Sequence, residues 1–158
     1  MFALKIVGTV CITGATTLYA RGLVNELSCR IAALKAIKQS FTTLKGELRY
    51  GVETLPSAFM HVGERCSCGQ ETVRDFFWNT GNRLKTENGS ILKEVWEEEA
   101  KKLAAAACLN GNECDNLIAV ADSLGYLDLT QQTNNIELYL QSVDESIEAL
   151  SGKYEQNS

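Results

Sequence analysis

The first third of the chain is apolar on every side at its start and then apolar on one side only. The stretch from Ile6 to Ala20 contains no charged residue. After Arg21 the apolar residues recur at intervals of three or four, as on one face of an α-helix: Leu23, Leu27, Ile31, Leu34, Ile37, Phe41, Leu44 and Leu48. No Pro interrupts these two parts. We therefore predict one long helix that begins in an apolar environment and continues into a helical bundle.

The rest of the chain predicts more helices and no strands. Helical spacing recurs over residues 57–64, 71–84 and 91–107, in a stretch that ends at Leu124, and in a last stretch to about Tyr154. Alternating β-branched residues are missing outside the first segment, and 158 residues suffice for one domain with its own core. The predicted fold is all-α: an antiparallel six-helix bundle over residues 21–155, after an N-terminal transmembrane segment at 1–20 and before a short tail at 156–158.

Three interpretations of residues 1–20 remain open. A membrane anchor of this length requires that Lys5 reach the interface and that the threonines donate hydrogen bonds to the helix backbone. A cleaved signal peptide would end near Ala20, but Leu18 occupies a position where a small residue is needed. A buried core helix is the third possibility. We favour the anchor, with the following part in the cytoplasm, because the basic residues follow the segment: Arg21, Arg30, Lys35 and Lys38.

Charge and motifs argue against several classes of function. The net charge of −5 is unsuited to nucleic acid as the main partner, because binding phosphates requires a basic face. The chain has no Gly-rich phosphate loop, no His-Glu-x-x-His and no Gly-x-Ser-x-Gly motif. The single His61 has no obvious catalytic partner and is expected at the rim of the fold. We expect no enzymatic activity, no cofactor and no small-molecule substrate.

Six cysteines are present, and we interpret them as free thiols in a reducing compartment. Cys11 and Cys29 lie in the predicted first helix, whereas Cys66, Cys68, Cys108 and Cys114 lie later in the chain. The later four do not have the spacing of common zinc sites. A zinc- or thiol-dependent regulator that uses these four remains an alternative, and it requires that the two cysteine-bearing loops meet.

An acidic run on the predicted fourth helix has two interpretations. Four carboxylates lie close together around Trp96, namely Glu94, Glu97, Glu98 and Glu99. They form either a solvated helix face or a docking surface for a basic partner.

Two motifs carry a resemblance to a known family. The stretch from Glu47 to Phe59 reads ELRYGVETLPSAF and contains Tyr50, Gly51 and Pro56. The second, LGYLDLTQQ from Leu124, contains Gly125, Asp128 and Gln132, and the stretch VWEEEA from Val95 is a weaker third. Together they resemble stage III sporulation protein AB of endospore-forming bacteria. The chain departs from that family in having Thr54 where Pro is frequent, and in stopping where a second hydrophobic helix commonly follows.

The resemblance implies a non-enzymatic membrane platform in the channel-like complex between mother cell and forespore, on the mother-cell side of the outer forespore membrane. The family's cytoplasmic domain is similar to the six-helix domain of the type II secretion F protein. The implied partners are a secretion-type ATPase, stage III sporulation protein AA, and other membrane proteins of the complex. The motif residues have a structural alternative, since Gly, Pro and Asp set helix ends and turns. The alternative function is a soluble all-α adaptor whose first helix is part of the core.

Overall fold

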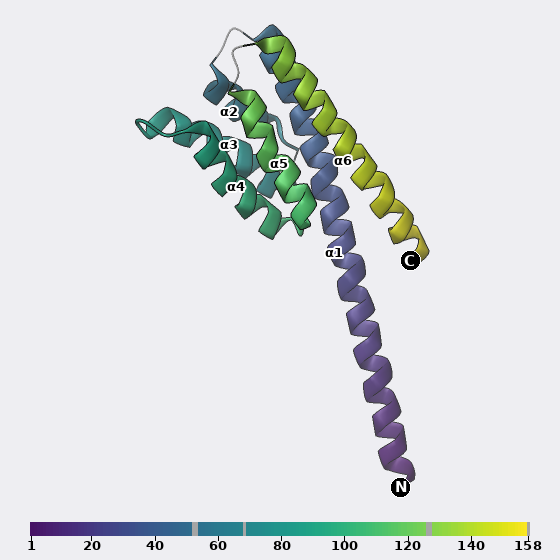
Figure 1. Cartoon of the computed structure of the whole chain (residues 1–158). Coiled ribbons are helices and arrows are strands. Elements are labelled where there is room, and N and C mark those ends of the chain that lie inside the picture. Colours follow the sequence, from purple (N-terminus) through teal and green to yellow (C-terminus); the bar gives the residue numbers. More distant parts are fainter. Residues whose placement is uncertain (52–53, 68, 126–127, 158) are drawn as a thin grey trace.

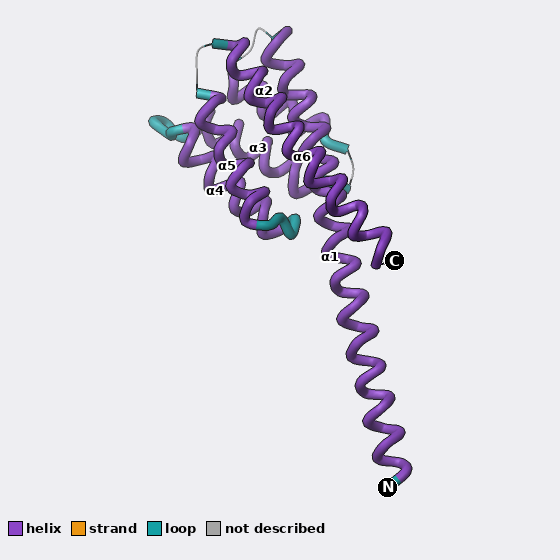
Figure 2. Tube along the Cα trace, turned by 45° about the vertical axis from the view of Figure 1, so that its right-hand side comes forward, coloured by secondary structure: helices purple, strands orange, loops and turns teal. Residues whose placement is uncertain are grey.

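The computed structural model is built from α-helices alone over the residues that it describes, 1–51, 54–67, 69–125 and 128–157, with backbone only for Ala3 and Asn157. Six helices follow one another (Figure 1): α1 (Phe2–Tyr50), α2 (Leu55–Arg65), α3 (Glu71–Thr86), α4 (Leu92–Ala106), α5 (Gly111–Leu124) and α6 (Leu129–Asn157). The helices pack together in one bundle, apart from the N-terminal part of α1, which extends beyond it (Figure 2). The predicted all-α six-helix fold is confirmed.

The first helix is continuous for 49 residues, as the lack of Pro predicts. Its C-terminal half packs against α6, which runs in the opposite direction, as two ion pairs demonstrate. Lys38 pairs with Asp144 at 2.6 Å, and Lys45 pairs with Glu137 at 3.7 Å, so the numbering rises in α1 while it falls in α6. The N-terminal half of α1 extends beyond the bundle, and α6 ends near the point where α1 leaves it (Figure 1).

An aromatic cluster at the centre of the bundle ties five helices together. Trp96 of α4 is fully buried, and the ring centroids of Phe41, Phe59, Phe76 and Phe77 lie 4.8–6.2 Å from its own. These rings come from α1, α2 and α3, and α6 adds a further ring that lies 4.7 Å from that of Phe41. The indole Nε1–H donates a 2.8 Å hydrogen bond to the Leu117 carbonyl of α5, so the Trp polar group is satisfied inside the core.

Two glycines allow α2 and α3 to pack closely. A Cβ at Gly81 would lie 2.5 Å from the Pro56 carbonyl oxygen, and a Cβ at Gly63 would lie 3.1 Å from backbone atoms of α3. Pro56 itself lies in the first turn of α2, as predicted, where its missing N–H costs no helix hydrogen bond. The short α2 is thereby held against α3 by backbone contact as well as by side chains.

The starts of α4 and α5 are capped differently. Ser90 has a side chain typical of an N-cap, but Ile91 occupies that position at α4, no side chain caps the helix, and the buried Ser90 Oγ makes no hydrogen bond. The complete capping box is instead at α5. There Asn110 Oδ1 accepts from the Glu113 N–H at 2.8 Å, and Glu113 Oε2 accepts from the Asn110 N–H at 3.0 Å.

Candidate functional site

The N-terminal part of α1 is an exposed apolar stalk, which we define as residues 2–26. Packing against the core begins at Leu27, and burial becomes complete at Ala33 and Leu34. The stalk exposes most of its large apolar side chains, namely Phe2, Leu4, Ile6, Val7, Val10, Ile12, Leu18, Tyr19 and Leu23. The alternative in which this segment is a buried core helix is therefore wrong.

The threonines of the stalk satisfy their hydroxyl groups within the helix, as the anchor interpretation requires. Thr9 donates to the Lys5 carbonyl at 2.8 Å, Thr13 to the Thr9 carbonyl at 2.8 Å, and Thr17 to the Thr13 carbonyl at 2.7 Å. Thr16 likewise donates to the Ile12 carbonyl at 3.0 Å. Within the part of the chain that the structure describes, which leaves out the Ala3 side chain, no helix is long and apolar enough to cross a membrane. The anchor at residues 1–20 stays a prediction.

The point where α1 leaves the bundle is fixed by an ion pair that sequence analysis missed. Arg30 donates two hydrogen bonds to Glu113 of α5, from Nε to Oε2 and from Nη2 to Oε1, both at 2.8 Å. The side chains of Arg30 and Glu113 are only 19% and 7% exposed. Because the same carboxylate also accepts the Asn110 N–H, the stalk exit and the start of α5 share one charge-assisted network. In the sequence, Arg30 stood out only as one of the basic residues that follow the apolar segment.

The first motif joins the C-terminal end of α1 to α2. Glu47 pairs with Arg65 at 2.9 Å, and His61 Nδ1 lies 4.0 Å from the same carboxylate. His61 is partly exposed, as expected for a histidine at the rim of the fold. It lies beside the Glu47 carboxylate, which belongs to another helix and so could not be identified as its neighbour from the sequence. These contacts give Glu47 a structural use, because they bind the end of α1 to α2.

Gly51 ends α1, and Tyr50 beside it is exposed. Gly51 has φ −80° and ψ 141°, an extended conformation, and not the left-handed conformation that glycine often has at a helix end. Glycine is nevertheless required, because a Cβ would overlap the Glu47 carbonyl oxygen that accepts the Gly51 N–H at 2.7 Å. Tyr50 is 81% exposed, and no hydrogen bond joins it to Asp128 among the described residues. Val52 and Glu53, which complete this motif, lie outside those residues.

The second motif fixes the junction between α5 and α6. Asp128 caps α6, as predicted, because its Oδ1 accepts the Thr130 N–H at 2.9 Å. Gln132 donates from Nε2 to the Leu124 carbonyl at 3.0 Å and so satisfies a carbonyl at the end of α5. Gly125 is the C-terminal cap of α5, as predicted, with the ordinary φ of −78°. Tyr126 and Leu127 lie outside the described residues. The contacts that the structure describes for these three residues are structural.

The acidic run of α4 divides into an exposed and a buried part. Glu94 and Glu98 are exposed and Glu97 is half-exposed, whereas the Glu99 side chain is only 3% exposed. Glu99 accepts from Lys102 at 2.8 Å and from Arg83 at 3.0 Å. Burial alone would raise the pKa of Glu99, but the hydrogen bonds from Lys102 and Arg83 outweigh it and hold the pKa below its ordinary value. Glu99 therefore cannot contribute to a docking surface, and the predicted set of four reduces to three.

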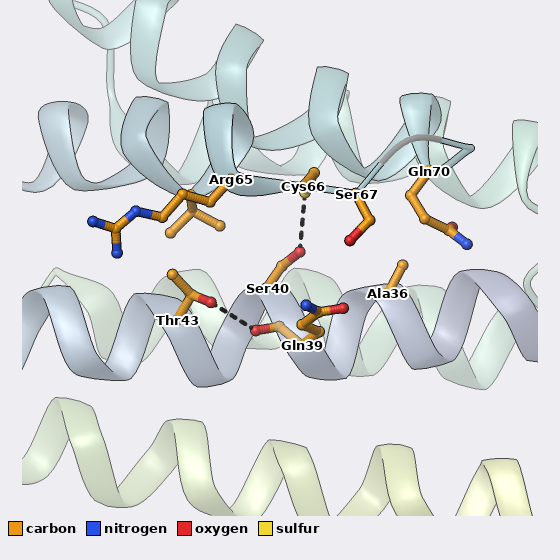
Figure 3. Close-up of a pocket in the computed structure, with 9 residues that line it drawn as sticks. Ala36, Gln39, Ser40, Thr43, Arg65, Cys66, Ser67 and Gln70 are labelled. Atoms are coloured by element: carbon orange, nitrogen blue, oxygen red, sulfur yellow. Dashed lines mark hydrogen bonds between the residues drawn. The ribbon is translucent and has the colours of Figure 1, made fainter.

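The cysteines do not gather in one place. Cys66 Sγ lies 3.3 Å from Ser40 Oγ, beside a cavity of about 10 Å³ between α1 and α2 (Figure 3). The α4–α5 connection, which carries Cys108, lies instead beside Arg30, because Glu113 accepts from both Arg30 and the Asn110 N–H. A rise of 1.5 Å per residue puts Arg30 roughly 15 Å along α1 from Ser40. The two loops of the proposed thiol set thus do not meet at these residues. Cys68 lies outside the described residues.

The described residues form a small cavity beside Cys66 and larger, more open grooves, one of about 360 Å³ between α1 and α6 that Ile31, Lys35 and Tyr154 line. They contain no group of three or more His, Cys, Asp or Glu side chains placed to hold a metal ion. The cavity beside Cys66 has room for about one water molecule, which its polar lining could bind: Gln39, Ser40, Thr43, Ser67 and Gln70 (Figure 3). The prominent features are therefore the stalk, its junction with the bundle, and the exposed carboxylates of α4.

Comparison with known proteins identifies similar chains. The family model described as stage III sporulation protein AB matches residues 5–158. Stage III sporulation protein AB of Bacillus subtilis (strain 168) is 24% identical over 143 residues, which cover 90% of this chain and 81% of that protein. A solved structure of a stage III sporulation protein AB has a TM-score of 0.70 at 20% identity, over 80% of this chain and 97% of the solved one. The structural likeness shows a shared fold.

Proposed function

The chain belongs to the stage III sporulation protein AB family, and from this we propose that it serves sporulation as a non-enzymatic membrane platform. In this role it transmits movement between a cytoplasmic secretion-type ATPase and membrane partners of the channel complex between mother cell and forespore. The bundle would then resemble the type II secretion F domain, and the protein would lie in the outer forespore membrane, facing the mother cell.

The observation that carries this proposal is the unbroken helix from the stalk into the core. Phe41 and Leu44 are fully buried in the bundle, while Ile6 and Val10 are more than half exposed on the same helix. A helix passes force along its axis only if its backbone hydrogen bonds are uninterrupted, and a flexible linker between domains would dissipate that force. The Arg30–Glu113 pair and the antiparallel contact with α6 brace the helix where it leaves the bundle.

Two features of the stalk support the proposal that it is a membrane anchor. Its apolar side chains face outward without a protein partner, and its threonines donate to carbonyls four residues earlier, which removes free donors from an apolar surrounding. Lys5 and Arg21 bound the uncharged stretch and would reach the two interfaces. Alkaline carbonate fractionation of the full-length protein tests this: we expect the protein in the pellet, and Val10→Lys in the supernatant. Extraction of the unaltered protein by carbonate would end the anchor proposal.

The ATPase, stage III sporulation protein AA, would dock on the exposed carboxylates of α4. Glu94 and Glu98 are exposed, and Glu97 is half-exposed and pairs with Lys101 at 2.6 Å. The triple variant Glu94→Gln, Glu97→Gln, Glu98→Gln should weaken ATPase pull-down about tenfold or more. A matched double variant on α6, Glu145→Gln and Glu148→Gln, removes exposed charges elsewhere and should bind normally. Equal pull-down by both variants would exclude this docking surface.

Rigidity of the stalk can be tested apart from folding and membrane binding. Asn25 is exposed on α1 between the uncharged stretch and the bundle. Asn25→Pro removes a helix hydrogen bond there and kinks the helix, whereas Asn25→Ala keeps it. We expect the Pro variant to fold, to bind the ATPase and to fail to support sporulation. Normal spore formation with Asn25→Pro would contradict a force-transmitting role for the helix.

A further inference from the structure

A groove of about 360 Å³ opens between α1 and α6, beside the point where the stalk leaves the bundle (Figure 1). Seven residues before Lys38 and seven after its ion-pair partner Asp144 are Ile31 and Ser151, so the antiparallel packing of the two helices extends to this groove. Both helices contribute polar side chains to its lining: Ser28, Lys35, Ser151 and Glu155. Ile31 and Tyr154 add an apolar surface. The volume lies in the range of small-molecule sites, about 300–1,000 Å³.

The hydroxyl groups that line this groove have no partner among the described residues. Past the first turn of each helix, every other Ser or Thr hydroxyl that the structure describes takes part in a hydrogen bond, in most cases with a carbonyl one turn earlier. Ser28 and Ser151 are the exceptions, and both line the groove. The Tyr154 hydroxyl likewise makes no hydrogen bond within the described part of the chain. Three groups that can each donate one hydrogen bond and accept others are therefore available to a ligand.

The groove also carries one unpaired charge of each sign. Lys35 of α1 and Glu155 of α6 form no ion pair with any side chain that the structure describes, whereas Lys38, about one turn further along α1, pairs with Asp144 of α6. A helical side chain leans toward the N-terminus of its own helix. Because α1 and α6 are antiparallel, the Lys35 ammonium and the Glu155 carboxylate lean toward each other. The groove thus presents a cation on one wall and an anion on the other.

We propose that this groove binds the headgroup of a phospholipid that has both a phosphate and a primary ammonium, and that the bound lipid fixes the height of the bundle above the membrane. The Lys35 ammonium donates to the phosphate oxygens, and Glu155 accepts from the ammonium of the lipid. The three free hydroxyl groups donate to the remaining phosphate and ester oxygens. An anionic headgroup would leave Glu155 unpaired beside a second negative charge, and a trimethylated ammonium has no N–H to donate. The two opposite charges therefore favour an aminophospholipid.

The lipid site rests on the membrane anchor proposed for the stalk, which would bring the groove to the headgroups. The residues from Ile6 to Asn25 include a single charged residue, Arg21, and extend for about 30 Å, the thickness of the hydrocarbon layer. Ser28 would then lie less than one helical turn beyond that layer, among the headgroups. Lys35 lies about two turns further along α1, and its flexible stem leans back toward the membrane.

Native mass spectrometry of the full-length protein in detergent tests the site with three lipids of identical acyl chains: phosphatidylethanolamine, phosphatidylcholine and phosphatidylglycerol. We expect the first phosphatidylethanolamine to bind about threefold or more tightly than either other lipid. Lys35→Gln and Glu155→Gln should each remove this preference. Ala32→Trp, at an exposed residue that lines the groove, should remove it by filling the space without a change of charge. The matched controls Lys153→Gln and Glu148→Gln alter exposed charges of α6 outside the groove and should keep it.

The site is overturned if the three lipids bind equally, if phosphatidylglycerol binds best, or if the groove variants keep the preference of the unaltered protein. Equally tight binding of soluble glycerophosphoethanolamine would show a free phosphate ester as the ligand and would overturn the membrane role. Carbonate fractionation tests the anchor separately, because the groove variants keep the stalk and should stay in the pellet. A missing lipid preference with the protein still in the pellet would therefore overturn the groove site and leave the anchor proposal intact.

Discussion

Replacing Arg30 by Met should destabilise the bundle more than breaking an ion pair on the surface. Met keeps an apolar stem of similar length and removes the guanidinium. The Glu113 carboxylate, which is 7% exposed beside Arg30, then keeps the Asn110 N–H as its one partner in this network. A charge left buried without its partner has lost its hydration and its compensating charge at once.

The expected loss follows from the geometry of the pair. Removing one partner of a fully buried ion pair costs about 3–5 kcal/mol. Arg30 is 19% exposed, so water can reach the vacated position and the cost should fall to about 2–3 kcal/mol. In a chain of this size each kcal/mol lowers Tm by about 2–4 °C, which gives a decrease of roughly 4–12 °C. Lys93→Met breaks the exposed pair with Asp122, where both side chains are 59% exposed, and should cost less than about 1 kcal/mol.

Thermal and urea unfolding of the full-length chain measure these differences, and a double variant identifies their cause. Glu113→Gln can still accept the Asn110 N–H and carries no charge. Adding it to Arg30→Met should therefore recover part of the lost stability, although each single change is destabilising. If Arg30→Met unfolds within about 0.5 kcal/mol of the unaltered protein, or if the second change adds to the loss, the reasoning about a buried uncompensated carboxylate is wrong.

Two further predictions concern packing and pH. Gly81→Ala would place a Cβ 2.5 Å from the Pro56 carbonyl oxygen and should lower the free energy of unfolding in urea by about 1–3 kcal/mol. Gly152→Ala, in open space on α6, should raise it by about 0.5–1 kcal/mol. Equal effects of the two changes would contradict the close approach of α2 and α3. The pKa of Glu99 is held below its ordinary value of 4.5 in the folded state, so its ionisation stabilises the fold above that pH, and this contribution is lost as the pH falls through the lowered pKa. Glu99→Gln should therefore be less stable at neutral pH and should lose less stability on acidification below pH 4.5, as thermal unfolding across that range would measure; parallel pH profiles would refute this.

The helices and their inward faces could be predicted because both depend on local spacing. The apolar residues of α1 recur every three or four positions, and Leu34, Ile37, Phe41 and Leu44 are all buried as that spacing requires. Asp128 is a second case, since an N-cap needs only a carboxylate at the start of a helix and a free N–H two residues later. Signals contained within one helix or one turn were therefore sufficient.

Contacts between distant segments could not be predicted in the same way. The acidic run of α4 looked uniform in sequence, yet Glu99 is turned inward to Arg83 of α3. Which carboxylate is buried depends on where the neighbouring helix lies, and a run of four similar residues does not contain that information.

The sequence by itself determined that the protein is helical, that its first helix is unbroken and that one face of this helix enters a core. Only the tertiary structure decided that Arg30 meets Glu113, because these residues are 83 positions apart. Helix periodicity operates over a few residues, whereas such pairs form only after α1 and α5 have packed together. The packing of the bundle, which buries the aromatic cluster around Trp96, therefore sets the geometry of the stalk exit.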